Sequence, residues 1–169
     1  GVDEVMTEGE LVTELSALEQ RAETIGNILD RKGEPDQVSV YRQVVVQMDR
    51  LFSEIKANRQ VKKSELDGVI DRIVDTTLES PDEMVALVLR GDRGESSLGK
   101  SAVDCCILSL VVGASMSMDA KKLRVLGRGA ALHDVGMTRV PDAIRGKKAD
   151  LTVEEIKRMR THTLHSYKI

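Results

Sequence analysis

The sequence predicts an all-α protein, and three observations support this fold class. Apolar residues recur at alternating spacings of three and four along most of the chain, which is the pattern of amphipathic helices. Only three of the 169 residues are proline and 13 are glycine, so few helix-breaking residues interrupt these runs. Two Tyr, one Phe and no Trp make the aromatic content very low. The core must therefore be aliphatic, and strand-rich folds are disfavoured.

Two apolar seams near the N-terminus predict a pair of helices over residues 8–30 and 38–55. Residues 31–36 separate them with a turn that contains Gly33 and Pro35. We therefore expect an antiparallel helical hairpin over residues 1–59, which serves packing or dimerisation. The first seam consists of Leu11, Leu15, Leu18, Ala22, Ile25 and Leu29, and the second of Val38, Tyr41, Val45, Met48, Phe52 and Ile55.

The middle of the chain predicts two further helices and a surface loop. Ser64, followed three residues later by Asp67, is typical of a helix start, and that helix should end near Glu79. Ser80 and Pro81 then predict the cap and first residue of a short helix that runs to about residue 89. Residues 90–97 have no apolar periodicity and are rich in Gly, Ser and charge, so they predict a loop.

The last third of the chain predicts a buried helix and two capped helices. Residues 101–116 are apolar nearly all round, which is typical of a central buried helix. Asp119 can cap the next helix, which leads to residue 133. Thr152 with Glu155 forms a capping-box pattern that opens a last helix, and that helix still continues at Ile169.

Charge and composition disfavour several classes of function and location. A net charge of -3 gives no basic surface for nucleic-acid polymers or membranes, and the scarce aromatic residues disfavour stacking on single strands. The longest uncharged stretch lies between Asp104 and Asp119, shorter than the roughly 20 residues of a membrane-spanning helix. No signal peptide is visible at the acidic N-terminus. Cys105 and Cys106 are neighbours, which suits a reducing compartment, so we expect a cytoplasmic protein.

One adjacent imidazole and carboxylate, His133 and Asp134, stands at the end of a predicted apolar helix and just before Gly136. Both groups are good ligands for zinc, manganese or iron, and a helix end can direct them at one divalent cation. The alternative is a helix-terminal histidine beside a solvated aspartate. Gly127 and Gly129 lack the third glycine and preceding strand of a dinucleotide-binding loop, so no organic cofactor site is predicted.

The context of this pair resembles the HD superfamily of metal-dependent phosphohydrolases, most closely its HD-GYP subfamily. The resemblance rests on residues 131–136 (Ala-Leu-His-Asp-Val-Gly), 140–144 (Val-Pro-Asp-Ala-Ile), 151–155 (Leu-Thr-Val-Glu-Glu) and 159–162 (Met-Arg-Thr-His). It implies that residues 60–169 form the first helices of an HD-type helical bundle. It also implies catalytic roles for His133 and Asp134, and metal ligation by these two residues and by His162. Active members use iron or manganese, and their usual substrate is cyclic di-GMP.

Three departures from the family pattern argue against activity of this chain. Lys100 stands where the first ligand histidine is expected, and an ammonium group has no lone pair for a cation. Met137 replaces a lysine that helps to hold the substrate phosphate. The later paired histidines, acid and Gly-Tyr-Pro loop are absent, while His165 has no firm counterpart and suits the exposed side of the last helix. Three candidate ligands can hold at most one loosely bound ion.

Two functional hypotheses follow from the resemblance and its departures. The chain is either an incomplete HD-GYP-like phosphodiesterase, inactive by itself, or a non-catalytic signalling or dimerisation scaffold with a degenerate HD fold. In both cases we expect a homodimer, because the two N-terminal seams offer more apolar length than one truncated domain need cover. A cyclic dinucleotide is the expected ligand of a full-length enzyme, and no nucleic-acid polymer or membrane partner is expected.

Overall fold

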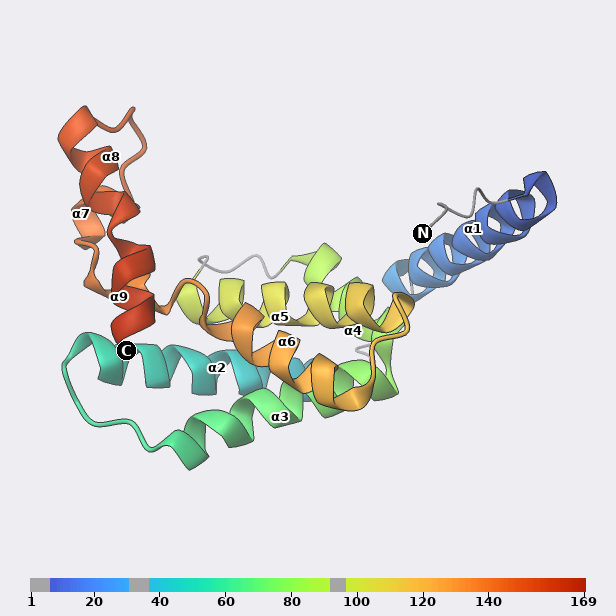
Figure 1. Cartoon of the computed structure of the whole chain (residues 1–169), viewed down its shortest axis with the longest axis horizontal. Coiled ribbons are helices and arrows are strands. Elements are labelled where there is room, and N and C mark those ends of the chain that lie inside the picture. Colours follow the sequence, from blue (N-terminus) through green and yellow to red (C-terminus); the bar gives the residue numbers. More distant parts are fainter. Residues whose placement is uncertain (1–6, 31–36, 92–96) are drawn as a thin grey trace, which may run out of the picture.

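In the computed structural model, the described residues are 7–30, 37–91 and 97–169, and these form helices and no strand (Figure 1). The all-α prediction is therefore confirmed. The expected turn at 31–36 and most of the expected loop at 90–97 lie outside the described residues. The elements in chain order are α1 (Glu8–Asp30), α2 (Gln37–Lys56), α3 (Lys63–Glu79), α4 (Pro81–Arg90), α5 (Leu98–Ser115), α6 (Ala120–Leu132), the 3-10 helix η1 (Val135–Arg139), α7 (Asp142–Arg145), α8 (Val153–Arg160) and α9 (His162–Lys168).

Helix α5 forms the centre of the bundle and packs against α2, α3, α4 and α6. Its side chains Val103, Cys106 and Ile107 are completely buried. Its opposite face is not covered, because Leu108 and Val112 are exposed. The expectation that this helix is buried all round is therefore wrong on that face. Among the described residues, α5 is also the one helix whose length and apolar composition would allow it to cross a membrane.

The two N-terminal helices form as expected, but they do not have the same surroundings. Helix α2 contributes its seam to the main core, where Met48 and Phe52 are buried against α3 and α5. Helix α1 packs against α4 instead, and Arg21 pairs with Asp82 at 2.7 Å. The expected hairpin required α1 and α2 to pack mainly against each other. Instead, α1 packs mainly against α4, and α2 packs mainly against α5. The division into residues 1–59 and 60–169 stays a prediction.

Helix caps follow the sequence prediction at most positions. The Asp119 carboxylate accepts a hydrogen bond from a backbone N–H in the first turn of α6 at 2.9 Å. Thr152 and Glu155 form the complete capping box of α8, each side chain bonding the other's backbone N–H. Ser64 differs, because it lies inside the first turn of α3 rather than before it. Ser80 stands at the N-cap of α4 as predicted, but its side chain makes no capping hydrogen bond.

The expected last helix is broken into α8 and α9 at Thr161. The hydroxyl of Thr161 donates to the carbonyl of Arg158 at 2.7 Å, which satisfies a carbonyl at the end of α8. The chain then turns so that α9 packs against η1, whereas α8 contacts α7 and α9. The prediction of one continuous helix is therefore wrong, and the break places His162 at the first turn of α9.

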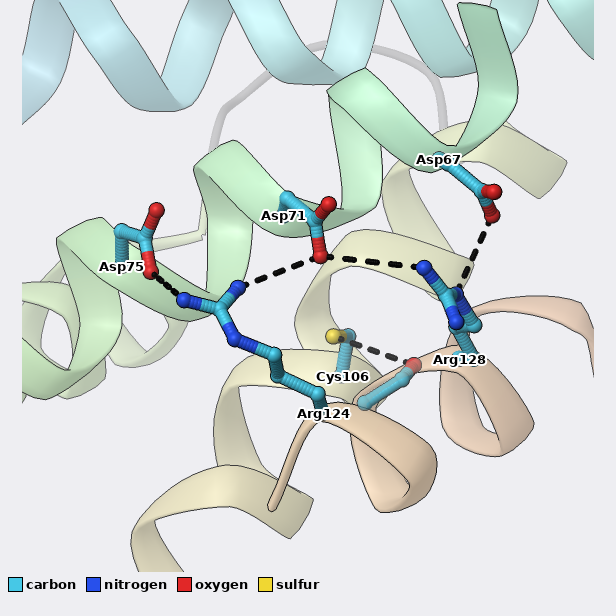
Figure 2. Close-up of polar contacts among 7 residues, drawn as sticks. Asp67, Asp71, Asp75, Cys106, Arg124 and Arg128 are labelled. Carbon is cyan, nitrogen blue, oxygen red and sulfur yellow. Dashed lines mark hydrogen bonds and ion pairs between the residues drawn. The ribbon is translucent and has the colours of Figure 1, made fainter. Parts of the chain in front are cut away.

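An ion-pair ladder joins the outer surfaces of α3 and α6 (Figure 2). Arg124 bonds Asp71 at 3.2 Å and Asp75 at 2.8 Å, and Arg128 lies 3.1 Å from Asp67. The acids recur every four residues on α3 and the arginines four residues apart on α6, so both sets face one another. Such exposed pairs each contribute at most about 1 kcal/mol, and the ladder mainly fixes the alignment of the two helices.

Beneath this ladder, the Cys106 thiol lies in the core with its sulfur 3.4 Å from the carbonyl oxygen of Gly127 (Figure 2). Burial disfavours the thiolate and raises the pKa of Cys106 to about 12, and the neighbouring Cys105 acts in the same direction. A buried thiol with a raised pKa lacks the exposure and the thiolate character of a nucleophilic cysteine.

This pKa predicts a specific loss of stability at alkaline pH. An unfolded chain releases the thiol proton near its ordinary pKa of 9.0, whereas the folded chain keeps it until about 12. Between these values the unfolded state binds fewer protons, so the free energy of unfolding falls as pH rises, by up to about 1.4 kcal/mol per pH unit. Urea unfolding at about pH 8 and pH 10.5 should show a smaller fall for Cys106→Ala than for the native chain. Equal falls would contradict the assignment.

Candidate functional site

The end of α6, the start of η1 and the start of α9 meet at one corner of the bundle. Helix α6 ends at Leu132, so that His133 occupies its C-cap position and Asp134 the position before η1. The first residue of α9, His162, lies beside them. The fold therefore brings together the three residues that the sequence singled out, although 28 residues separate Asp134 from His162.

The carboxylate of Asp134 lies between the two imidazoles. One of its oxygens is 3.3 Å from Nε2 of His133, and the other is 3.3 Å from Nε2 of His162. Each imidazole is also held from behind, because Nδ1 of His133 lies 2.8 Å from the carbonyl oxygen of Ala130, and Nδ1 of His162 lies 2.7 Å from that of Met159. A carbonyl oxygen can only accept, so both Nδ1 atoms carry the proton.

Each Nε2 atom therefore faces a carboxylate oxygen, as a donor if the ring is an imidazolium and with its lone pair if the ring is neutral. In either form a proton or a cation must stand between the nitrogen and the oxygen for the contact to be favourable. Second-shell bonds from Nδ1 to a carbonyl are the usual way in which a metal-binding histidine is oriented. The imidazoles approach different oxygens of Asp134, however, and the described residues contain no group of three or more His, Cys, Asp or Glu already arranged as a metal site.

Ser166, which the sequence analysis did not single out, fixes α9 to residues 133–136, the segment that joins α6 to η1. The hydroxyl of Ser166 donates to the carbonyl of His133 at 2.9 Å and accepts from the backbone N–H of Gly136 at 2.8 Å. Ser166 lies four residues after His162, on the same side of α9. The four-residue spacing from His162 was the one indication in the sequence that Ser166 belongs to the site. It could be interpreted only once α9 was seen to pack against η1.

Gly136 is required at this contact because the two backbones approach closely. A Cβ atom at this position would lie 2.0 Å from the carbonyl oxygen of His162 and 2.4 Å from the backbone nitrogen of Ser166. No side chain fits there. The glycine therefore allows α9 to approach η1 closely enough for His162 to reach Asp134.

Lys100, at the position expected for a first ligand histidine, belongs to a compact polar network. Its ammonium lies 2.6 Å from one oxygen of Asp104, and the hydroxyl of Tyr41 donates to the other oxygen at 2.6 Å. The Lys100 and Asp104 side chains are each about one-fifth exposed. The positive charge of Lys100 is thus paired within the bundle, one turn along α5.

A pocket of about 520 Å³ lies beside the turn, and Met137 and Thr138 of η1 form part of its wall. Two positively charged side chains of the pocket lining pair with the same carboxylate. Lys56 lies 2.6 Å from Asp142, and Arg145 also contacts Asp142. Hydrogen bonds from Lys56 and then Arg145 lower the pKa of Asp142. His133, Asp134 and His162 are not among the residues that line this pocket.

Comparison with known proteins gives one distant similarity. A cyclic di-GMP phosphodiesterase of Pseudomonas aeruginosa is 25% identical to this chain over 112 residues, which cover 66% of the chain and 27% of that protein. The chain thus spans about a quarter of the length of this relative. No family model matches the chain, and no solved structure matches it significantly.

The close contact at Gly136 yields a testable prediction. Gly136→Ala should lower the free energy of unfolding by about 3 kcal/mol or separate α9 from η1, because backbone atoms cannot move aside as a side chain can. Gly129→Ala is the matched control, since no heavy atom lies within 4 Å of a Cβ there. In α6 it should stabilise the protein by about 1 kcal/mol.

Chemical denaturation measures both changes, and hydrogen exchange in α9 separates global destabilisation from local release. Equal effects of the two alanine substitutions would contradict the role assigned to Gly136.

Proposed function

We propose that the chain is the portion of an HD-GYP-like metal-dependent phosphohydrolase, of the cyclic di-GMP phosphodiesterase class, that carries the histidine–aspartate pair and the next histidine. The distant similarity to a cyclic di-GMP phosphodiesterase supports this class. The proposal includes catalytic roles for His133 and Asp134 in a complete enzyme. The chain by itself is proposed to be inactive.

The observation that carries the proposal is the position of both Nε2 atoms against the oxygens of Asp134. Adjacent ligands on an octahedral iron or manganese ion with bonds of about 2.1 Å lie roughly 3.0 Å apart. The two N–O separations are 3.3 Å and involve different oxygens of Asp134, so the side chains must rearrange before one ion can contact all three residues. We propose that His133, Asp134 and His162 hold one divalent cation, iron or manganese, after this rearrangement. Bound there, such an ion would act as a Lewis acid toward a phosphate oxygen.

A centre with two ions does not fit the described residues. Two-metal hydrolysis needs separate ligand sets a few ångströms apart, so that one ion serves the attacking oxygen and the other the leaving oxygen. At the position on α5 where the family resemblance places a first ligand histidine, this chain has Lys100, which is paired with Asp104. A fixed ammonium repels a cation and donates no lone pair to it. This mismatch supports the proposed inactivity of the chain.

The polar network of Lys100, Asp104 and Tyr41 also favours the second candidate function, a non-catalytic scaffold. A partly buried ion pair with a second hydrogen bond to the carboxylate is costly to break, because each charge would lose its partner. Such a network can keep the fold intact where a catalytic relative would have a metal ligand. Metal binding distinguishes the two functions, since a scaffold needs no ion.

Metal titration tests the proposed site. With added Mn²⁺ or Fe²⁺, elemental analysis should find no more than one ion per chain. Asp134→Asn should weaken binding by at least tenfold, about the loss that follows even from removing a second-shell partner. His165→Ala, on the same helix as His162, is the matched control and should bind as the native chain does. Two tightly bound ions would refute the proposed ligand set, and no binding would favour the scaffold.

The inactivity is tested with cyclic di-GMP as substrate. The purified chain, with Mn²⁺ or Fe²⁺ present, should release no more linear product than the His133→Ala variant, because one ion cannot serve both the attacking and the leaving oxygen. Chromatographic detection of the product is sufficient. Turnover above that of the variant would show that the chain is catalytically complete.

A further inference from the structure

The N-terminal half of α1 extends beyond the bundle (Figure 1). Every described side chain from residue 7 to residue 20 is exposed. These side chains include Leu11, Val12, Leu15 and Leu18, and the last of these is 62% exposed. A row of exposed leucines on one projecting helix is unusual for a protein surface and marks an interaction site.

The other end of α1 is fixed to the bundle. Ile28 is buried, and the guanidinium of Arg90 donates to the carbonyls of Ile28 and Leu29, at 2.9 Å each. Arg21 is held by Asp82 at 2.7 Å. The projecting half therefore continues a positioned helix but has no packed face of its own. Isolated helical segments of this length are marginal in water, so contact with another surface would stabilise it.

We propose that the projecting half of α1 pairs with the same segment of a second copy of this chain, in antiparallel orientation. The spacing of Leu11, Leu15, Leu18 and Ala22 is four, three and four residues, the repeat of a two-helix coiled coil. A symmetric pair buries the same stripe of both chains. In the antiparallel register, Leu15 of one copy packs beside Leu18 of the other.

The charges beside the stripe decide the orientation. Glu14 and Arg21 flank it on one side, and Val12 and Glu19 on the other. A parallel pair would place Glu14 against Glu19 of the second copy, which is repulsive. An antiparallel pair places Glu14 against Arg21, which is attractive. Arg21 can bind both acids, since its bond to Asp82 uses Nε and the guanidinium has four further N–H donors.

Light scattering coupled to gel filtration tests the pairing. At tens of micromolar, the chain should elute with twice its 18.6 kDa mass. The double variant Leu15→Glu and Leu18→Glu should be monomeric and still folded, losing at most the helical circular dichroism signal of the projecting half of α1, because both side chains are exposed in one chain. Val125→Glu is the matched control: Val125 on α6 is 65% exposed, and its variant should stay dimeric.

Two charge reversals test the orientation by sedimentation. Glu14→Arg should weaken the antiparallel dimer about tenfold, because Arg then faces Arg in two symmetric places. Glu19→Arg should leave it unchanged. In a parallel dimer both variants would bind more tightly, which would overturn the orientation. A monomeric native chain, or a dimer that survives the double leucine variant, would overturn the proposal.

Discussion

The burial of one face of α5 among α2, α3 and α6 is the constraint on which the arrangement of the other helices depends. At its start, α5 approaches α2 so closely that a Cβ on Gly99 would lie 2.6 Å from the backbone nitrogen of Asp49. Because the two helices are so close, the carboxylate of Asp49 accepts hydrogen bonds from the backbone N–H of Gly99 at 2.9 Å and from the hydroxyl of Ser97 at 2.7 Å. One acid thus joins two core helices and satisfies the N-terminus of α5.

The candidate site depends on a second, smaller contact at the edge of this bundle. Its geometry comes from backbone proximity at Gly136 and from the two hydrogen bonds of Ser166, rather than from apolar burial. His133 and Asp134 are about half exposed there. Ala131 and Val135, on either side of the pair, nevertheless belong to the main core. The core therefore fixes where His133 and Asp134 stand, and the smaller contact fixes how His162 meets them.

Two local arrangements bear on the candidate functions. The imidazoles of His133 and His162 lie against the carboxylate of Asp134, and on α5 the charge of Lys100 is paired with Asp104, which also accepts from Tyr41. Both candidate functions rest on this combination.

The sequence by itself determined the helices and most of their limits, because apolar period, caps and breakers act on neighbouring residues. Asp119 and the Thr152–Glu155 box are examples. It also pointed to the residues of the site through their resemblance to a known motif. Tertiary structure decided which helix faces are covered: the seam of α2 lies in the core, and the similar seam of α1 is exposed at its N-terminal half.

Tertiary structure also decided the break at Thr161 and the meeting of His162 with Asp134. These features depend on contacts between segments distant along the chain. Periodicity specifies that a helix has an apolar face, but two seams with the same period are indistinguishable until their partners are known. For the same physical reason Ser166 could not be recognised in advance, since its two hydrogen bonds exist only after α9 packs against η1.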